Sequence, residues 1–168
     1  TLAYALAVEE AAGLSMPPEG ARLRAVLLEL ERLYNHVADL GALANDTGFG
    51  LAHAHSLALR ERLLRLNATV SGHRLLRGAI TPGAVRLQRL PDLEVVRDVA
   101  AEAAELADLT LRHSVIHDRF AGTGVLTAEQ ATDLGCLGVV ARASGVAVDA
   151  RVDHPTVDVV PEVVVETG

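Results

Sequence analysis

Apolar residues recur at three- and four-residue steps through much of this chain, most clearly between residues 23 and 44. The apolar positions of that stretch are Leu23, Val26, Leu27, Leu30, Leu33, Tyr34, Val37, Leu40 and Ala44. This spacing describes one face of an α-helix. Pro18 and Glu19 suit the first turn of such a helix, and Gly48 and Gly50 suit its end.

The same period predicts three further helices. A short helix covers Leu2 to Ala12 and stops at Gly13, a second long helix runs from about His53 to Leu76, and a third spans Leu93 to Asp118. The second long helix carries its apolar stripe at Leu59, Leu63, Leu66 and Val70. The stripe of the third comprises Val96, Val99, Ala100, Ala103, Leu106 and Ala107.

Turn signals separate these segments. Pro82 and Gly83 form a turn dipeptide, and Thr127 with Gln130 makes a capping box for a short helix. From Gly135 onward the composition shifts towards loop and strand, and we expect a small β element after Val157. The predicted fold is therefore mainly α, as one domain over residues 1–168: a bundle of three long amphipathic helices with a small β element at the C-terminal end.

Composition narrows the classes of function. The chain has 168 residues, 50% of them hydrophobic and 2% aromatic, so it can bury a core built mostly from aliphatic side chains. A net charge of −7 argues against binding to nucleic acid or to an anionic lipid surface. No apolar run reaches the roughly 20 residues of a membrane span. A lone cysteine, Cys136, fits a reducing compartment, and we expect a cytoplasmic protein.

Seven histidines raise the possibility of a metal site. His53 and His55 would fall on different faces of a helix, whereas His113 and His117 are four residues apart and could share an ion. No cysteine or acidic partner stands at a ligand spacing nearby, so two solvated histidines on a polar face are the favoured interpretation. We predict no metal ligands in this chain.

Charged residues form two groups that have ordinary structural explanations. One side of the first long helix carries Glu29, Arg32, His36 and Asp39. Such a row is most simply a ladder of surface charges. Arg142 and Arg151 flank a Ser-Gly turn with Asp149 between them, which suggests an ion pair that stabilises an irregular loop. Asp46 follows the long helix beside two glycines, and its simplest role is a turn or cap residue.

The order of several separated motifs adds a resemblance to a known family. ELERLYNH, NDTGFG, LRERLLRLNATVSGHR, GTGVLTAEQA and ARASGVAVDARVDHP follow one another between about Tyr4 and Pro155. In this order they resemble the large subunit shared by membrane-bound nickel-iron hydrogenases, such as that of formate hydrogenlyase, and the 49 kDa subunit of respiratory complex I. The chain opens on Thr1 within a helical pattern, so we expect an internal fragment of such a subunit.

The resemblance implies roles for particular residues. In complex I relatives an aspartate that orients a quinone-contacting histidine matches Asp46, and we expect Asp46 and His36 to be the catalytic positions. Arg60 and Arg142 are expected to contact a cofactor. Two positions depart from the family: Thr81 stands where relatives carry an arginine before Pro-Gly-Gly, and Leu76 aligns with a histidine close to an iron-sulfur cluster.

The resemblance also implies a function and partners. We expect part of an NADH:quinone oxidoreductase or of an energy-converting hydrogenase, in which electrons pass to quinone or to protons. The alternative is a scaffold subunit whose catalytic site has decayed. The four cysteines that hold a nickel-iron centre in hydrogenases would lie outside this chain, so the chain itself should hold no cofactor. Expected partners are an iron-sulfur subunit, membrane subunits at the inner face of the cell membrane and a quinone, and exposed apolar surface should favour self-association.

Overall fold

The computed structural model describes residues 1–155 and residue 157. Helices make up 67% of these residues and strands 3%, which confirms the mainly α prediction. The chain divides into two compact units, Thr1–Ala121 and Gly122–Gly168. The predicted β element after Val157 lies outside the described residues.

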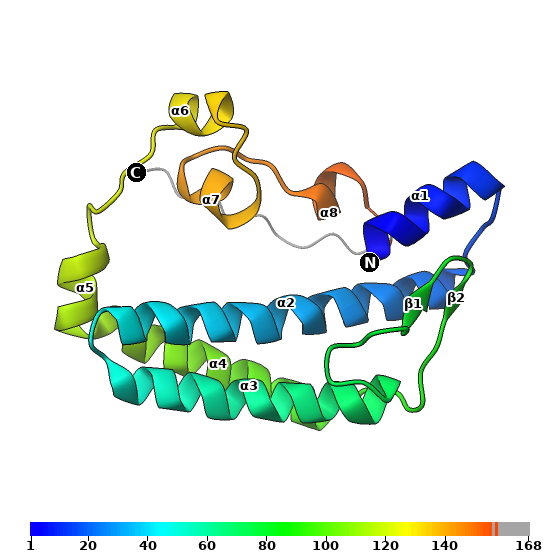
Figure 1. Cartoon of the computed structure of the whole chain (residues 1–168), viewed down its shortest axis with the longest axis horizontal. Coiled ribbons are helices and arrows are strands. Elements are labelled where there is room, and N and C mark those ends of the chain that lie inside the picture. The colour runs from blue at the N-terminus through cyan, green and yellow to red at the C-terminus, as the bar shows by residue number, and fades with distance from the viewer. Residues whose placement is uncertain (156, 158–168) are drawn as a thin grey trace. The chain divides into compact units, whose positions relative to one another are not determined.

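The first unit contains five helices and a short hairpin (Figure 1). The helices are α1 (Leu2–Ala12), α2 (Pro18–Asp46), α3 (Gly50–Ser71), α4 (Leu93–Arg112) and α5 (Ser114–Phe120). The helix α1 ends at Gly13, whose φ of 64° is a left-handed conformation that glycine adopts without steric cost. Pro17 and Pro18 then set the start of α2, where a missing backbone donor costs nothing.

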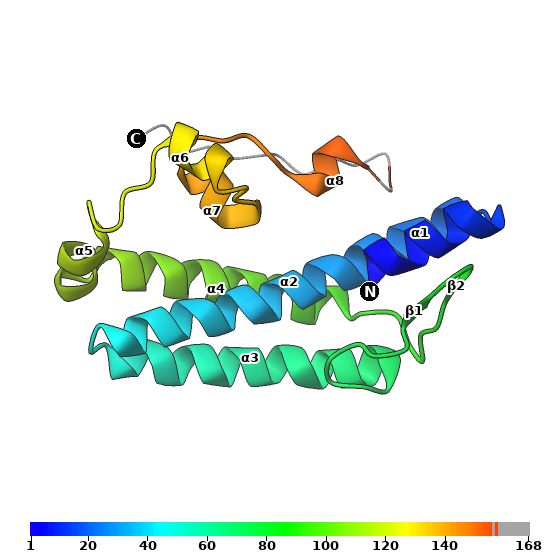
Figure 2. The same cartoon turned by 45° about the horizontal axis from the view of Figure 1, so that its top comes forward.

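The core of this unit lies between α2, α3 and α4. The helices α2 and α3 run side by side in opposite directions, and α4 packs against both (Figures 1 and 2). The buried apolar residues are Leu27, Leu30, Tyr34, Val37 and Ala44 from α2, Ala52, Leu59, Leu63, Leu64, Leu66 and Val70 from α3, and Val99 and Leu106 from α4. The apolar stripes of the sequence therefore face one another, as helical periodicity requires.

A small residue lets α2 and α3 approach closely near the turn between them. Gly41 is buried, and a Cβ atom added there would lie 2.5 Å from the Cβ of Ser56. The Gly41 carbonyl oxygen lies 3.0 Å from Nδ1 of His53 on α3. This contact joins the backbone of α2 to a side chain of α3, while the closeness of Ser56 leaves no room for a Cβ at position 41.

The predicted Pro82-Gly83 turn closes a two-stranded antiparallel hairpin. Strands β1 (Ile80–Thr81) and β2 (Ala84–Val85) pair with Ile80 opposite Val85. Beyond β2 the chain returns to the end of α3, where the Gln88 backbone N–H donates to the Val70 carbonyl at 2.7 Å. The hairpin is thereby attached to the C-terminal end of α3.

Two helix ends differ from the sequence prediction. The helix α3 stops at Ser71 rather than Leu76, because Gly72 adopts a left-handed φ of 81°. The third long helix does not reach Asp118: the backbone is extended at His113, with ψ of 123°, and α5 starts afresh at Ser114. His113 and His117 therefore do not share one helix, which removes the geometry behind a possible shared ion.

The second unit contains three short helices, α6 (Ala128–Asp133), α7 (Gly138–Ala143) and α8 (Ala150–Asp153). The capping box at α6 is confirmed, since the Thr127 hydroxyl accepts from the Gln130 backbone and the Gln130 side chain accepts from Thr127. The expectation of loop and strand after Gly135 is wrong for α7 and α8. Within the described residues, no helix combines the length and apolarity that a membrane span needs.

Candidate functional site

Asp46 is the last residue of α2, and its side chain is exposed. No hydrogen bond or ion pair to its carboxylate occurs among the residues that the structure describes. The C-terminal end of a helix carries partial negative charge, which disfavours an acidic side chain there. His36 is also exposed but lies ten residues earlier on the same helix, about 15 Å along the axis at 1.5 Å per residue. The structure does not bring these two predicted residues together.

The turn that follows Asp46 is held by several contacts. The Thr47 hydroxyl donates to the carbonyl oxygens of Leu43 and Ala44, each at 3.0 Å. The ring of Phe49 stacks on the ring of His113, with centroids 4.1 Å apart, which ties this turn to the junction of α4 and α5. Asp46 therefore projects from a fixed turn rather than from a loose loop.

Arg60 lies on α3 and contacts α2. Its guanidinium carbon is 5.9 Å from the centroid of the Tyr34 ring, a cation–π distance. The Nε atom of Arg60 is buried and has no hydrogen-bond partner within the described part of the chain. Arg60 is thus half-buried over a core tyrosine.

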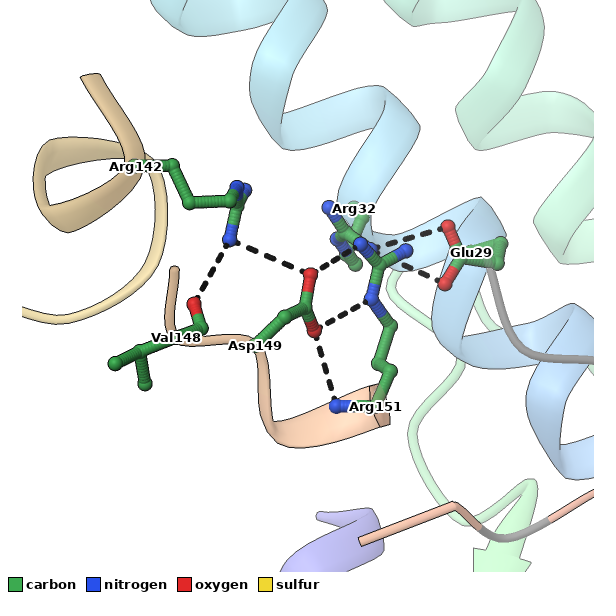
Figure 3. Close-up of polar contacts among 6 residues, drawn as sticks. All are labelled: Glu29, Arg32, Arg142, Val148, Asp149 and Arg151. Atoms are coloured by element: carbon green, nitrogen blue, oxygen red, sulfur yellow. Dashed lines mark hydrogen bonds and ion pairs between the residues drawn. The ribbon is translucent and has the colours of Figure 1, made fainter. Parts of the chain in front are cut away.

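Arg142, the second predicted cofactor residue, belongs to the second unit and shares a carboxylate with Arg151 (Figure 3). Asp149 accepts from Arg142 at 3.3 Å and from the Arg151 side chain at 3.0 and 2.6 Å. Asp149 also caps α8 by accepting from the backbone N–H of Arg151. The predicted ion pair in this loop is confirmed. Figure 3 also shows the Glu29–Arg32 pair, at 3.2 Å, of the predicted charge ladder on α2.

A buried ion pair that the sequence prediction missed joins α1, α2 and the hairpin. Two nitrogens of Arg24 donate to the carboxylate of Glu9, at 3.0 and 2.5 Å. The same guanidinium donates to the carbonyl oxygens of Thr81 and Ala84, at 2.7 and 3.3 Å. The backbone N–H of Gly83 donates to Glu9 at 2.6 Å. We call this set of five residues the Glu9–Arg24 clamp.

The electrostatics of the clamp favour the ionised form of its acid. Glu9 and Arg24 are 5% and 2% exposed. The hydrogen bond from Arg24, followed by that from the Gly83 backbone, lowers the pKa of Glu9 to about 2. A signal was present in the sequence: Glu9 follows Ala5 by four residues and Arg24 precedes Leu27 by three, so each lies on the buried face of its helix.

A second charged cluster fixes the segment that follows α3. Glu61 accepts from Arg74 at 3.0 and 2.5 Å and from Arg65 at 2.9 Å, and these bonds lower the pKa of Glu61 to about 2. Asn67 donates to the Arg74 carbonyl oxygen at 3.2 Å. Leu76, the position at which the family is expected to carry a histidine, is buried with a left-handed φ of 57°. A leucine adopts this conformation only where its surroundings enforce it.

The described residues contain no group of three or more His, Cys, Asp or Glu side chains arranged to hold a metal ion. The sequence has one cysteine, Cys136, which is partly exposed. The residues present therefore do not supply the thiolate set that a nickel-iron centre needs.

Comparison with known proteins places these features in a family. Residues 46–158 match the model of the family described as respiratory-chain NADH dehydrogenase, 49 Kd subunit. Formate hydrogenlyase subunit 5 of Escherichia coli is 34% identical over 92% of this chain and 28% of its own length. NADH-quinone oxidoreductase subunit 4 of Thermus thermophilus is 34% identical over 92% of this chain and 39% of its own. Membrane-bound hydrogenase subunit alpha of Pyrococcus furiosus is 30% identical over 88% of this chain and 36% of its own. The chain thus spans well under half the length of these relatives.

Proposed function

This chain belongs to the family of the 49 kDa subunit of respiratory-chain NADH dehydrogenase, and we propose that it forms the helical core of a redox-complex large subunit. In this role it supports the transfer of electrons from a reduced donor to quinone or to protons. The relatives named above include both NADH-quinone oxidoreductases and hydrogenase components. Both classes pass electrons to a small acceptor, so the proposal is common to them.

The exposed carboxylate of Asp46 carries the proposal. It stands at the end of α2 where the helix dipole disfavours it, and it has no partner among the described residues. Its turn is nevertheless fixed by the contacts of Thr47 and Phe49. A carboxylate at this helix end costs stability, although the turn that carries it is held in place. We therefore attribute Asp46 to a function rather than to stability. We propose that Asp46 accepts a hydrogen bond from an imidazole or guanidinium of another segment or subunit and so orients it for proton delivery.

His36, Arg60 and Arg142 have different support. Arg60 has a half-buried guanidinium without an ion pair within the described residues, so it could meet an anionic group of the assembly. Arg142 forms an ion pair with Asp149, which favours a structural role for Arg142 in the loop of the second unit. His36 is exposed on α2, and the features described around it give it no chemical role. The support for a functional role is therefore strongest for Asp46, followed by Arg60, and is weaker for His36 and Arg142.

We propose the partners and the location from the relatives. An iron-sulfur subunit would supply electrons, and membrane subunits would hold the complex at the inner face of the membrane, with this chain on the cytoplasmic side. A nickel-iron centre would need cysteines from outside this chain, because its single cysteine cannot form the site.

Replacement of Asp46 by asparagine in the intact complex tests the proposal. Shape is kept and charge is lost, so the complex should assemble normally while turnover falls by about 10- to 100-fold, the usual cost of losing a residue that orients a functional group. Turnover is measured as quinone reduction or hydrogen evolution, and assembly by subunit stoichiometry on a native gel.

Asp39→Asn is the matched control, because Asp39 is another exposed aspartate on α2. Its turnover should equal that of the parent. If fully assembled Asp46→Asn complexes also turned over like the parent, Asp46 would be a turn residue and the proposed role would be wrong.

A further inference from the structure

Six of the fifteen basic residues of this chain lie in one stretch that has no acidic residue. Residues 62–91 contain no aspartate or glutamate, in a protein whose net charge is −7. The arginines of the stretch are Arg62, Arg65, Arg74, Arg77, Arg86 and Arg89. This stretch covers the end of α3, the segment after it, the hairpin and the return towards α4. It makes a basic region within an acidic protein.

Three of these arginines are unpaired, and the fold brings their backbones together. Arg77, Arg86 and Arg89 are exposed, and none of their guanidinium groups makes an ion pair or hydrogen bond with the described residues. The Arg86 backbone N–H donates to the Ala79 carbonyl at 2.8 Å, two residues from Arg77. The Arg89 backbone N–H lies 3.3 Å from the Val70 carbonyl. The other three arginines of the stretch already pair with Glu61 or Glu102.

A shallow, open hollow with a mostly aliphatic lining lies beside these charges. It is lined by Leu23 of α2, Val85 of β2, and Leu87, Gln88, Arg89 and Leu90 of the return segment. Leu90 is 71% exposed although it borders this hollow. Four aliphatic side chains next to an unpaired guanidinium form a surface that is both apolar and positive.

Hydrogen bonds and ion pairs within the chain hold this surface in place without a partner. The Glu9–Arg24 clamp fixes the hairpin at Thr81, Gly83 and Ala84. The bonds between Glu61 and Arg74 fix the segment after α3. Figures 1 and 2 show the hairpin and the C-terminal end of α3 at the same end of the first unit. A preformed surface loses little conformational entropy on binding, which favours its use as a docking site.

We propose that Arg77, Arg86, Arg89 and the adjoining hollow, the basic hairpin face, bind an acidic polypeptide segment of a partner subunit. Carboxylates of that segment would pair with the arginines, and one apolar side chain would enter the hollow. A hollow with aliphatic walls fits a side chain better than a lipid headgroup. This inference stands independently of the electron transfer and of the Asp46 role proposed above, since a scaffold subunit would use the same surface.

A labelled synthetic peptide with four glutamates around a central leucine tests the charge requirement. Binding to the purified 168-residue chain is followed by fluorescence anisotropy. Arg86→Glu with Arg89→Glu should weaken binding at least about tenfold, because two attractions become repulsions. The matched pair Arg97→Glu with Arg119→Glu, which changes exposed arginines on α4 and α5, should change the Kd less than about twofold.

The apolar hollow is tested separately. Leu90→Ser should weaken binding by about threefold or more, while Leu111→Ser, at a 53% exposed position on α4, should leave the Kd unchanged. All altered side chains are exposed, so the variants should keep the parent's circular dichroism. Three results would overturn the proposal. They are no detectable peptide binding at low salt, an equal loss of peptide affinity in the two double arginine variants, or tighter binding to phosphatidylserine vesicles than to the peptide.

Discussion

At the scale of single residues, the Glu9–Arg24 clamp is the most unusual feature of the first unit. A buried ion pair is a weak source of stability by itself, because both charges lose their hydration. Here the carboxylate also receives a backbone N–H, and the guanidinium also reaches two carbonyl oxygens. The pair thus satisfies the backbone of a two-stranded hairpin that has no other strand to pair with among the described residues. Its main effect is to fix the position of that hairpin.

The clamp predicts how stability depends on acid. The pKa of Glu9 falls from 4.5 to about 2 on folding, so the folded state favours the ionised acid. This stabilisation is complete above pH 4.5 and is lost as pH falls towards 2. Glu9→Gln should lower stability at neutral pH, since it leaves Arg24 buried without a counter-ion, and should flatten the pH dependence between these limits. Urea unfolding from pH 7 down to pH 2.5 measures both effects.

Glu61→Gln is the control for this prediction. The pKa of Glu61 is also about 2, but its side chain is 39% exposed, so solvent screens its ion pairs. At neutral pH, Glu61→Gln should lower the free energy of unfolding by less than Glu9→Gln does. If both variants lost the same free energy of unfolding, burial of the Glu9–Arg24 pair would not increase its contribution to stability.

The clamp also shows the limit of sequence reasoning at this scale. The apolar pattern that predicts α2 does not include Arg24, although Arg24 precedes Leu27 by three residues and lies on the same buried face. A charged residue on a buried face is recognised only when its partner is known, and Glu9 lies 15 positions away. By contrast, the pairing of Arg142 and Arg151 with Asp149 is local in sequence and could be predicted.

At the scale of elements, the contact between α2 and α3 depends on Gly41. A methyl group at this position would meet the Cβ of Ser56 at 2.5 Å, so the two helices would have to separate. Gly41→Ala should therefore destabilise the chain by about 1–3 kcal/mol, the usual cost of overpacking. The measurement is the free energy of unfolding in urea.

Gly50→Ala provides the control, because a Cβ at Gly50 meets no atom within 4 Å. This variant should be neutral or more stable by about 0.5–1 kcal/mol, as alanine restricts the unfolded chain and favours helix. A second check is Ser56→Gly in the Gly41→Ala background, which should recover part of the loss. If Gly41→Ala were as stable as Gly50→Ala, the close approach of α2 and α3 would not be a constraint.

Helix positions could be predicted better than helix ends. The start of α2 and the apolar faces of α2 and α3 follow from periodicity and from the prolines before α2, whereas α3 begins at Gly50, three residues before the predicted start. The sequence predicts the end of α3 at Leu76, five residues too late, because the helix ends before Gly72 and Leu76 is buried from a turn with φ of 57°. The break at His113 carries no proline or glycine, and the stacking of its ring on Phe49 is a tertiary contact. The spacing of neighbouring residues in the sequence does not predict tertiary contacts of this kind.

At the scale of the whole molecule, family membership rests on the order of motifs, whereas no single residue of the site could carry it. Asp46 alone is a plausible turn residue, and the resemblance is what suggests a role for it. The partners that would complete a redox site lie outside this sequence, which spans 28% of one relative and 39% of another. Sequence and structure together therefore show the family and its helical core, and the roles of Asp46 and of the basic hairpin face are proposals.

The most direct test of the redox role is to isolate the complex that contains this chain. An affinity tag on the protein expressed in its source cell allows purification from detergent-extracted membranes. We predict that iron-sulfur signals in electron paramagnetic resonance spectra, together with quinone reduction or hydrogen evolution, co-purify with the tagged chain. A tagged chain that purifies with its partner subunits but without iron-sulfur signals and without either activity would contradict the redox role and leave a scaffold.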